Sequence, residues 1–146
     1  ILKTDPATAV SEYEEAQKAV LAAEDRKSDP YRKLAAAFDE KMRALGRARL
    51  YPENRFSIPV QFLRIGGAVW VGLPFEVLSE ISLKMKARFP NTVLVSCAGG
   101  YQGYLPLAYE YDRGGYEASA SSTHFAPGTA DRLLEAILKW LETHPA

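Results

Sequence analysis

Near residue 50, the spacing of apolar residues changes from the period of a helix to that of a strand, and this limits the folds open to the chain. Residues 6–24 place apolar side chains three or four positions apart in a segment rich in Ala, Glu and Lys, as an amphipathic helix does. A second stripe with the helical period starts at Pro30, a residue suited to the first position of a helix. Residues 1–50 are therefore predicted to form a helical hairpin, or two helices that cover the face of a sheet whose other strands come from elsewhere.

Beyond residue 50, apolar residues alternate as in a β-strand. Two such runs are separated by Gly66-Gly67, which predicts a β-hairpin. Three further segments are predicted, namely a helix from Glu76 to Phe89, a buried strand over 91–98 and a final helix over 127–142. Residues 51–146 are therefore predicted to form an α/β fold, a small mixed sheet with flanking helices.

The composition excludes several classes of partner. The chain carries 18 basic and 18 acidic side chains with no long run of either sign, so we expect no binding to nucleic acid or to an anionic membrane. No window holds the roughly 18 consecutive apolar residues of a membrane-spanning helix, so no transmembrane segment is predicted. The single cysteine, Cys97, is expected to be a structural thiol at the end of a buried strand.

The first residues indicate a longer polypeptide, because Ile1-Leu2-Lys3 is not an ordinary translation start. In addition, two or three strands form a poor sheet without further strands. We therefore expect residues 51–146 to be the C-terminal part of a larger α/β catalytic domain. The missing N-terminal part of the same polypeptide would be their main partner.

Glu76 is the first residue that could carry chemistry. It follows an apolar strand that ends in Gly-Leu-Pro, and α/β proteins commonly place their sites at the carboxyl ends of strands. A glutamate at the start of a helix is also favoured by the helix dipole. Local sequence alone favours this structural role.

The second candidate is a tyrosine-rich stretch over residues 99–122, which lacks a sustained helix or strand period. Its five tyrosines are Tyr101, Tyr104, Tyr109, Tyr111 and Tyr116. Phenols can donate protons, stabilise an oxyanion or bind a metal, and they can equally pack beneath a surface loop. His124 follows a serine run, where a solvated or capping histidine is favoured over a Ser-His pair. With two histidines and one cysteine, the chain has no metal-binding cluster of usual spacing.

Four motifs follow one another in a specific order: Gly-Leu-Pro-Phe-Glu76, Val-Leu-Val-Ser96, Gly-Gly-Tyr101-Gln-Gly-Tyr104 and Gly-Gly-Tyr116-Glu-Ala-Ser119. This ordered set resembles the neutral/alkaline non-lysosomal ceramidase family and its bacterial ceramidase-like relatives. The resemblance extends from about Ile58 to Leu141 and is more specific than any one motif.

The resemblance implies three site residues. In that family, a Pro-Gly-Glu or Pro-Ala-Glu turn supplies a glutamate ligand to the catalytic zinc, and Glu76 stands at the same place. The second tyrosine of a closely spaced pair is a further zinc ligand, which falls on Tyr104. Another active-site tyrosine matches Tyr116, at the family's expected separation of 12 residues (116 − 104). Glu76 and Tyr104 are thus the implied metal ligands, and Tyr116 is the implied catalytic residue.

The implied function is zinc-dependent hydrolysis of an N-acyl amide, with a lipid-like substrate such as a sphingolipid. The family's histidine ligands, general base and arginine lie upstream, so zinc is expected in the full-length protein and no tight zinc site in this chain alone. The family is commonly secreted or membrane-associated, which favours a secreted or periplasmic location. Phe75 replaces the family's small residue, and the helix after Glu76 is shorter, so the identity of the substrate stays open.

A non-catalytic binding or scaffold domain is the alternative, with the five tyrosines lining an apolar groove. A plain structural role, in which the same tyrosines form core, is a third possibility. The amidase hypothesis predicts that Glu76, Tyr104 and Tyr116 converge on one cleft. A scaffold predicts that they diverge.

Overall fold

The structure is a computed structural model that describes residues 4–53 and 55–145. It divides the chain into two compact units, Ile1–Phe56 and Ser57–Ala146. Within the described residues, no helix is long and apolar enough to cross a membrane.

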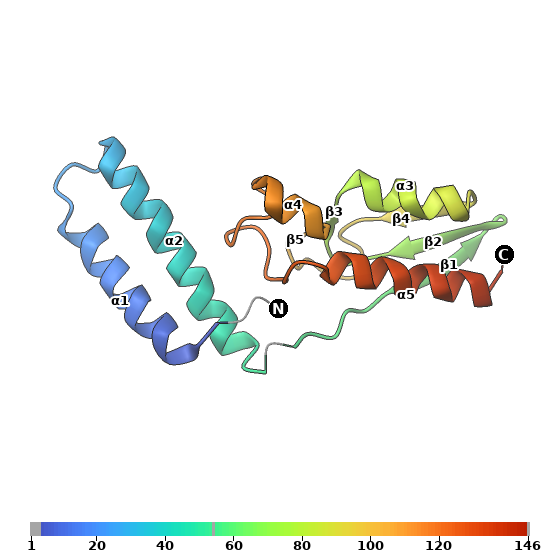
Figure 1. Ribbon diagram of the computed structural model, residues 1–146, viewed down its shortest axis with the longest axis horizontal. Coiled ribbons are helices and arrows are strands. Elements are labelled where there is room, and N and C mark those ends of the chain that lie inside the picture. The colour runs from blue at the N-terminus through green and yellow to red at the C-terminus, as the bar shows by residue number, and fades with distance from the viewer. Residues whose placement is uncertain (1–3, 54, 146) are drawn as a thin grey trace. The chain divides into compact units, whose positions relative to one another are not determined.

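The first unit is the predicted helical hairpin (Figure 1), formed by α1 (Pro6–Ala22) and α2 (Asp29–Leu50). Each helix begins at a side-chain cap, because the carboxylate of Asp5 and the hydroxyl of Ser28 accept backbone N–H groups of the first turn. The helices pack through a small apolar cluster of Ala9, Leu45, Ala48 and Tyr13. The hairpin therefore has a core of its own.

The second unit is built on a three-stranded mixed sheet in the order β1-β2-β4. The strands are β1 (Gln61–Ile65), β2 (Ala68–Gly72) and β4 (Thr92–Val95). β1 and β2 form the predicted antiparallel hairpin, and β4 is parallel to β2. The turn needs glycine because Gly66 and Gly67 both have positive φ, +57° and +79°.

A second, two-stranded parallel ladder continues from the end of β2. It pairs β3 (Glu76–Val77) with β5 (Tyr104–Leu105). The helices of this unit are α3 (Ser79–Arg88), α4 (Ala108–Arg113) and α5 (Thr129–Thr143). The chain order β2, α3, β4 is the crossover that parallel neighbours require.

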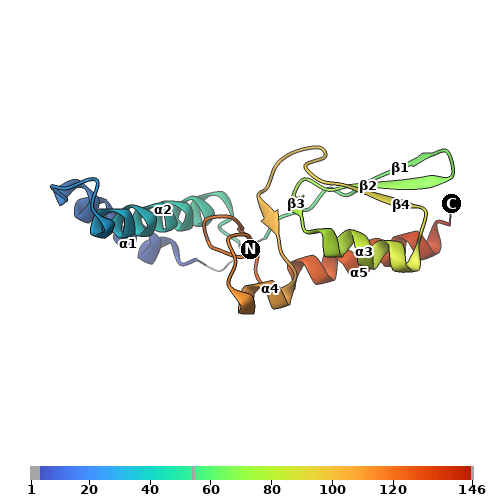
Figure 2. The same ribbon diagram turned by 90° about the horizontal axis from the view of Figure 1, so that it is seen from above.

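Helices α3 and α5 lie on the same face of the three-stranded sheet (Figure 2). The core between these layers consists of buried side chains from both, namely Val69, Val71, Ile81, Met85, Ile137 and Leu141. Phe62 of β1 belongs to this layer, because its ring stacks on Trp140 of α5 with 3.7 Å between centroids. Leu63 and Trp70, which are opposed across β1 and β2, are exposed on the other face.

Three local predictions were wrong. Glu76 does not begin a helix, because it lies in β3 and α3 starts only at Ser79. Cys97 is exposed and has a φ of +55°, so it is not the end of a buried strand. Residues 93–95 are only half-buried, since the helices cover one face of the sheet.

Candidate functional site

The backbone around Glu76 is fixed from both sides at the carboxyl end of β2. Four backbone hydrogen bonds hold this segment. The N–H groups of Ala98 and Cys97 donate to the carbonyl oxygens of Leu73 (2.8 Å) and Phe75 (2.9 Å). On the other side, the N–H of Gln102 donates to the carbonyl of Pro74 (2.7 Å), and the N–H of Glu76 donates to the carbonyl of Gly103 (2.9 Å). These bonds, which we call the backbone clamp, place residues 73–76 between two later segments of the chain. The Phe75 side chain is fully buried and packs edge-to-face against Phe125.

Gly103 sets the close approach of the tyrosine-rich stretch. Its φ is +75°, and a Cβ atom at this position would lie 2.6 Å from the carbonyl oxygen of Ser122. A side chain is therefore excluded here both by conformation and by space. The next residue, Tyr104, donates its backbone N–H to the same Ser122 carbonyl over 3.0 Å. The glycine thus positions Tyr104 opposite Glu76.

The carboxylate of Glu76 interacts with two phenols. Tyr104 is its direct partner in the parallel register of β3 and β5, and each of the two groups shifts the pKa of the other. The hydroxyl of Tyr101 donates a hydrogen bond to Glu76 Oε1, with 2.5 Å between the oxygens. Hydrogen bonds of this length are typical of charged acceptors, which indicates that the Glu76 carboxylate is ionised.

The protonation states follow from the same contacts. The Tyr101 hydroxyl, and after it the Tyr104 hydroxyl, hold the pKa of Glu76 below its usual value. In return, the Glu76 carboxylate raises the pKa of Tyr101 and raises that of Tyr104 to about 12. At neutral pH, Glu76 is therefore an anion and both phenols keep their protons.

Tyr116 completes the cluster from a third segment. Its ring meets the ring of Tyr104 edge-to-face, with 5.8 Å between centroids and 80° between planes. Tyr116 is 67% exposed, so this contact leaves it open to a bound molecule. The structure therefore brings Glu76, Tyr104 and Tyr116 together.

Two of the five tyrosines face elsewhere. The hydroxyl of Tyr109 donates to Glu80 of α3, and that of Tyr111 donates to the carbonyl oxygen of Phe125 over 2.7 Å. These bonds tie α4 to its neighbours. The five tyrosines consequently do not share a single surface.

Tyr101 is the residue that sequence reasoning did not assign to the site. It lies in the same loop as Tyr104, shortly before it in the sequence, and the glycine-rich residues around it show neither a helical nor a strand period. The parallel pairing of Glu76 with Tyr104 is the feature that would have pointed to it. That pairing is tertiary and was not predicted.

Glu76 and Tyr104 supply oxygen atoms of the kind that zinc binds. The two residues are directly opposed in the register of β3 and β5, and each shifts the pKa of the other. Within the described residues, no group of three or more His, Cys, Asp or Glu side chains could hold a metal ion.

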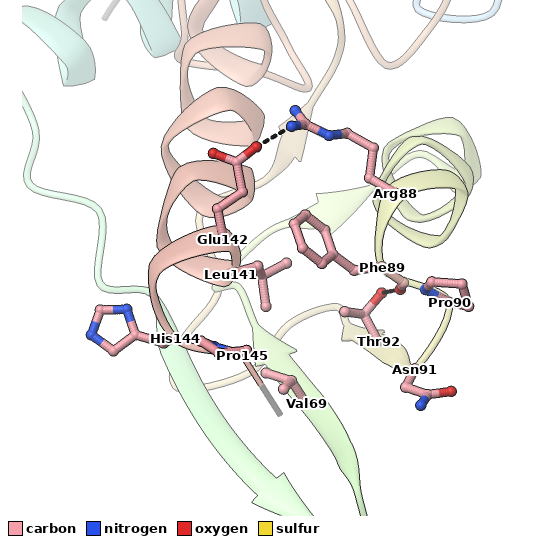
Figure 3. A pocket seen from close by; sticks show the side chains of 10 residues that line it. All are labelled: Val69, Arg88, Phe89, Pro90, Asn91, Thr92, Leu141, Glu142, His144 and Pro145. Atoms are coloured by element: carbon pink, nitrogen blue, oxygen red, sulfur yellow. Dashed lines mark hydrogen bonds and ion pairs between the residues drawn. The ribbon is translucent and has the colours of Figure 1, made fainter.

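A separate cavity of about 250 Å³ lies at the other end of the sheet (Figure 3). Val69 and Thr92 line it at the starts of β2 and β4, and Phe89 and Leu141 close it from the helix side. Arg88 of α3 points across the opening to Glu142 of α5 and forms an ion pair with it. Because parallel sheets usually bind ligands at the carboxyl ends of their strands, the tyrosine cluster is the stronger candidate site.

Comparisons with models of protein families, with curated proteins and with solved structures found no match to this chain. The function of the cluster is therefore inferred from its residues, its geometry and the sequence resemblance.

Proposed function

We propose that this chain supplies part of the active site of a zinc-dependent amidase that resembles the neutral ceramidases. The observation that supports the proposal best is the direct pairing of Glu76 with Tyr104 across β3 and β5, with the ring of Tyr116 against Tyr104. The residues match the family's motifs in sequence and also lie together in space. The remaining zinc ligands would be histidines from sequence outside this chain, so the chain alone would be inactive.

Each residue has a role that follows from its environment. Zinc, when bound in such a site, activates a water molecule and polarises the amide carbonyl. Glu76 is an anion at neutral pH and supplies a carboxylate oxygen to the metal. Tyr104 would give up its proton there, because a bound cation reverses the effect of the neighbouring carboxylate. Tyr116, exposed and held by an aromatic contact, would donate its hydroxyl to the tetrahedral oxyanion.

The proposed substrate is an N-acyl amide with a lipid-like acyl chain, and the proposed location is secreted or periplasmic. Both come from the resemblance. The alternative of a scaffold with a five-tyrosine groove has less support, since the hydroxyls of Tyr109 and Tyr111 are bound to Glu80 and Phe125.

The test is made on the full-length protein that contains this chain. Zinc content and N-acyl amide hydrolysis are measured for the wild type and for Glu76→Gln and Tyr104→Phe. Glu80→Gln and Tyr109→Phe are matched controls, because they remove the same groups from a phenol–carboxylate pair outside the site. We expect zinc and activity to fall in the site variants only. A wild type without zinc and activity, or equal losses in site and control variants, would refute the proposal.

A further inference from the structure

We propose that Tyr101 is a positioning residue for Glu76: its hydroxyl fixes the carboxylate through Oε1 and leaves the remaining lone pairs free for a metal ion shared with Tyr104. This inference rests on the proposed function for its metal-binding part. The orientation of Glu76 by Tyr101 stands on geometry alone. A carboxylate offers about four acceptor positions, so one phenol and one cation can bind it together.

The first observation is the way in which the loop presents Tyr101. Gly99 and Gly100 have φ values of +74° and +149°, which few residues other than glycine adopt. The next residue, Gln102, is pinned by its 2.7 Å bond to the Pro74 carbonyl. Tyr101 therefore lies between a glycine turn and a fixed point of the backbone clamp, and its hydroxyl reaches Glu76 Oε1 at 2.5 Å.

The second observation is that Tyr101 is 61% exposed. Its ring contributes little to the core, so the stability of the fold does not explain its placement. Removing its hydroxyl is consequently expected to affect Glu76 rather than the folding of the unit. This separates a positioning role from a structural one.

The third observation comes from a second phenol–carboxylate pair in the same unit. Glu80 accepts from Tyr109 and is also paired with the ammonium of Lys84 at 3.1 Å. No lysine or arginine in the described part of the chain forms an ion pair with Glu76. The Glu76 carboxylate is thus held by a phenol and by no cation of the described residues, in the way that a hydrogen-bond donor beside a metal site orients a metal ligand.

The first measurement uses this 146-residue chain without metal. The side-chain carboxyl groups of Glu76 and Glu80 are titrated by NMR in the wild type, in Tyr101→Phe and in the matched control Tyr109→Phe. We expect the pKa of Glu76 to rise only in Tyr101→Phe and that of Glu80 to rise only in Tyr109→Phe. An unchanged Glu76 pKa in Tyr101→Phe would overturn the positioning role, whatever the function.

The second measurement uses the full-length protein and its zinc affinity. Removal of a group that holds a metal ligand in place typically lowers metal affinity about 10- to 100-fold, and we expect this loss in Tyr101→Phe but not in the matched control Tyr109→Phe. Loss of zinc in Glu76→Gln with unchanged affinity in Tyr101→Phe would overturn the inference and leave the amidase proposal standing. If Glu76→Gln also left zinc and activity unchanged, the proposed function itself would fail.

Discussion

Glu76 and Tyr104 are directly opposed in the parallel register of β3 and β5, so their side chains emerge on the same side of that ladder. Leu105, the next residue of β5, is fully buried. A shift of the register by one residue would exchange the buried Leu105 with the half-buried Tyr104. Burial of the leucine therefore keeps the tyrosine beside the glutamate.

The first prediction concerns the titration of Tyr104. Its pKa is raised to about 12 by Glu76, so Glu76→Gln is expected to lower it toward the ordinary value of about 10. The phenolate absorbance of the chain, measured as a difference from Tyr104→Phe, would report the change. Because a raised pKa favours the folded state only while the phenol is protonated, this contribution is complete below about pH 10. It is lost as the pH rises toward 12. The same midpoint in wild type and Glu76→Gln would contradict the prediction.

The second prediction concerns acid stability. The pKa of Glu76 is lowered by Tyr101 first, and that of Glu80 by Tyr109 first. A lowered carboxyl pKa stabilises the fold above the unfolded value of about 4.3, and the contribution is lost as the pH falls below it. The wild type loses this stability on acidification, and Tyr101→Phe and Tyr109→Phe lack part of it from the start. The melting temperatures of these two variants are therefore expected to fall less than that of the wild type as the pH is lowered. Tyr111→Phe is the control, since its hydroxyl binds a carbonyl, and an equally small fall in it would count against the prediction.

The third prediction concerns Gly103. Gly103→Ala adds a Cβ atom 2.6 Å from the Ser122 carbonyl oxygen at a φ of +75°. Gly114→Ala shares the positive φ, +65°, with nothing within 4 Å of the added atom. The left-handed conformation alone costs a non-glycine residue about 1–2 kcal/mol. Gly114→Ala is therefore expected to lower the free energy of unfolding by about that amount, and Gly103→Ala is expected to lower it clearly more. The free energy of unfolding in urea measures both, and equal losses would show that Ser122 does not limit the space.

The fourth prediction concerns Phe75, where the ceramidases have a small residue. Its side chain is fully buried, against Phe125. Phe75→Ala, which introduces the family's small residue, is expected to cost about 3–5 kcal/mol of unfolding free energy. The control is Leu83→Ala, at a leucine that is 65% exposed, with an expected change within about 0.5 kcal/mol. A loss below about 1 kcal/mol in Phe75→Ala would mean that the core closes over the cavity.

The sequence predicted the parts of the fold that local patterns determine. The turn at Gly66-Gly67 and the two helices of the hairpin follow from backbone chemistry and periodicity, and both are confirmed. The extended conformation of Glu76 was missed, because a two-residue strand depends on β5, which is distant in sequence. Exposure of Cys97 was missed because burial of a strand depends on which face of the sheet the helices cover.

The candidate site was predicted through the motifs rather than through spacing alone. Glu76, Tyr104 and Tyr116 do lie together, while their roles as zinc ligands and catalytic phenol stay predictions. Tyr101 escaped assignment since its contact depends on the loop geometry at Gly99 and Gly100. A loop of that kind has no period that sequence reasoning could detect.

Because of the backbone clamp, the position of Glu76 relative to the tyrosine loop does not depend on the length of α3, the helix that connects these two parts of the site. Residues 73–76 are tied to residues 95–98 and 102–103 by main-chain bonds that α3 does not share. Whole turns could therefore be gained or lost in α3 without moving the carboxylate. Loss of a single residue between Ala98 and Gly103 would instead separate Glu76 from both phenols. We expect natural length variation to collect in the crossover and to avoid this six-residue loop.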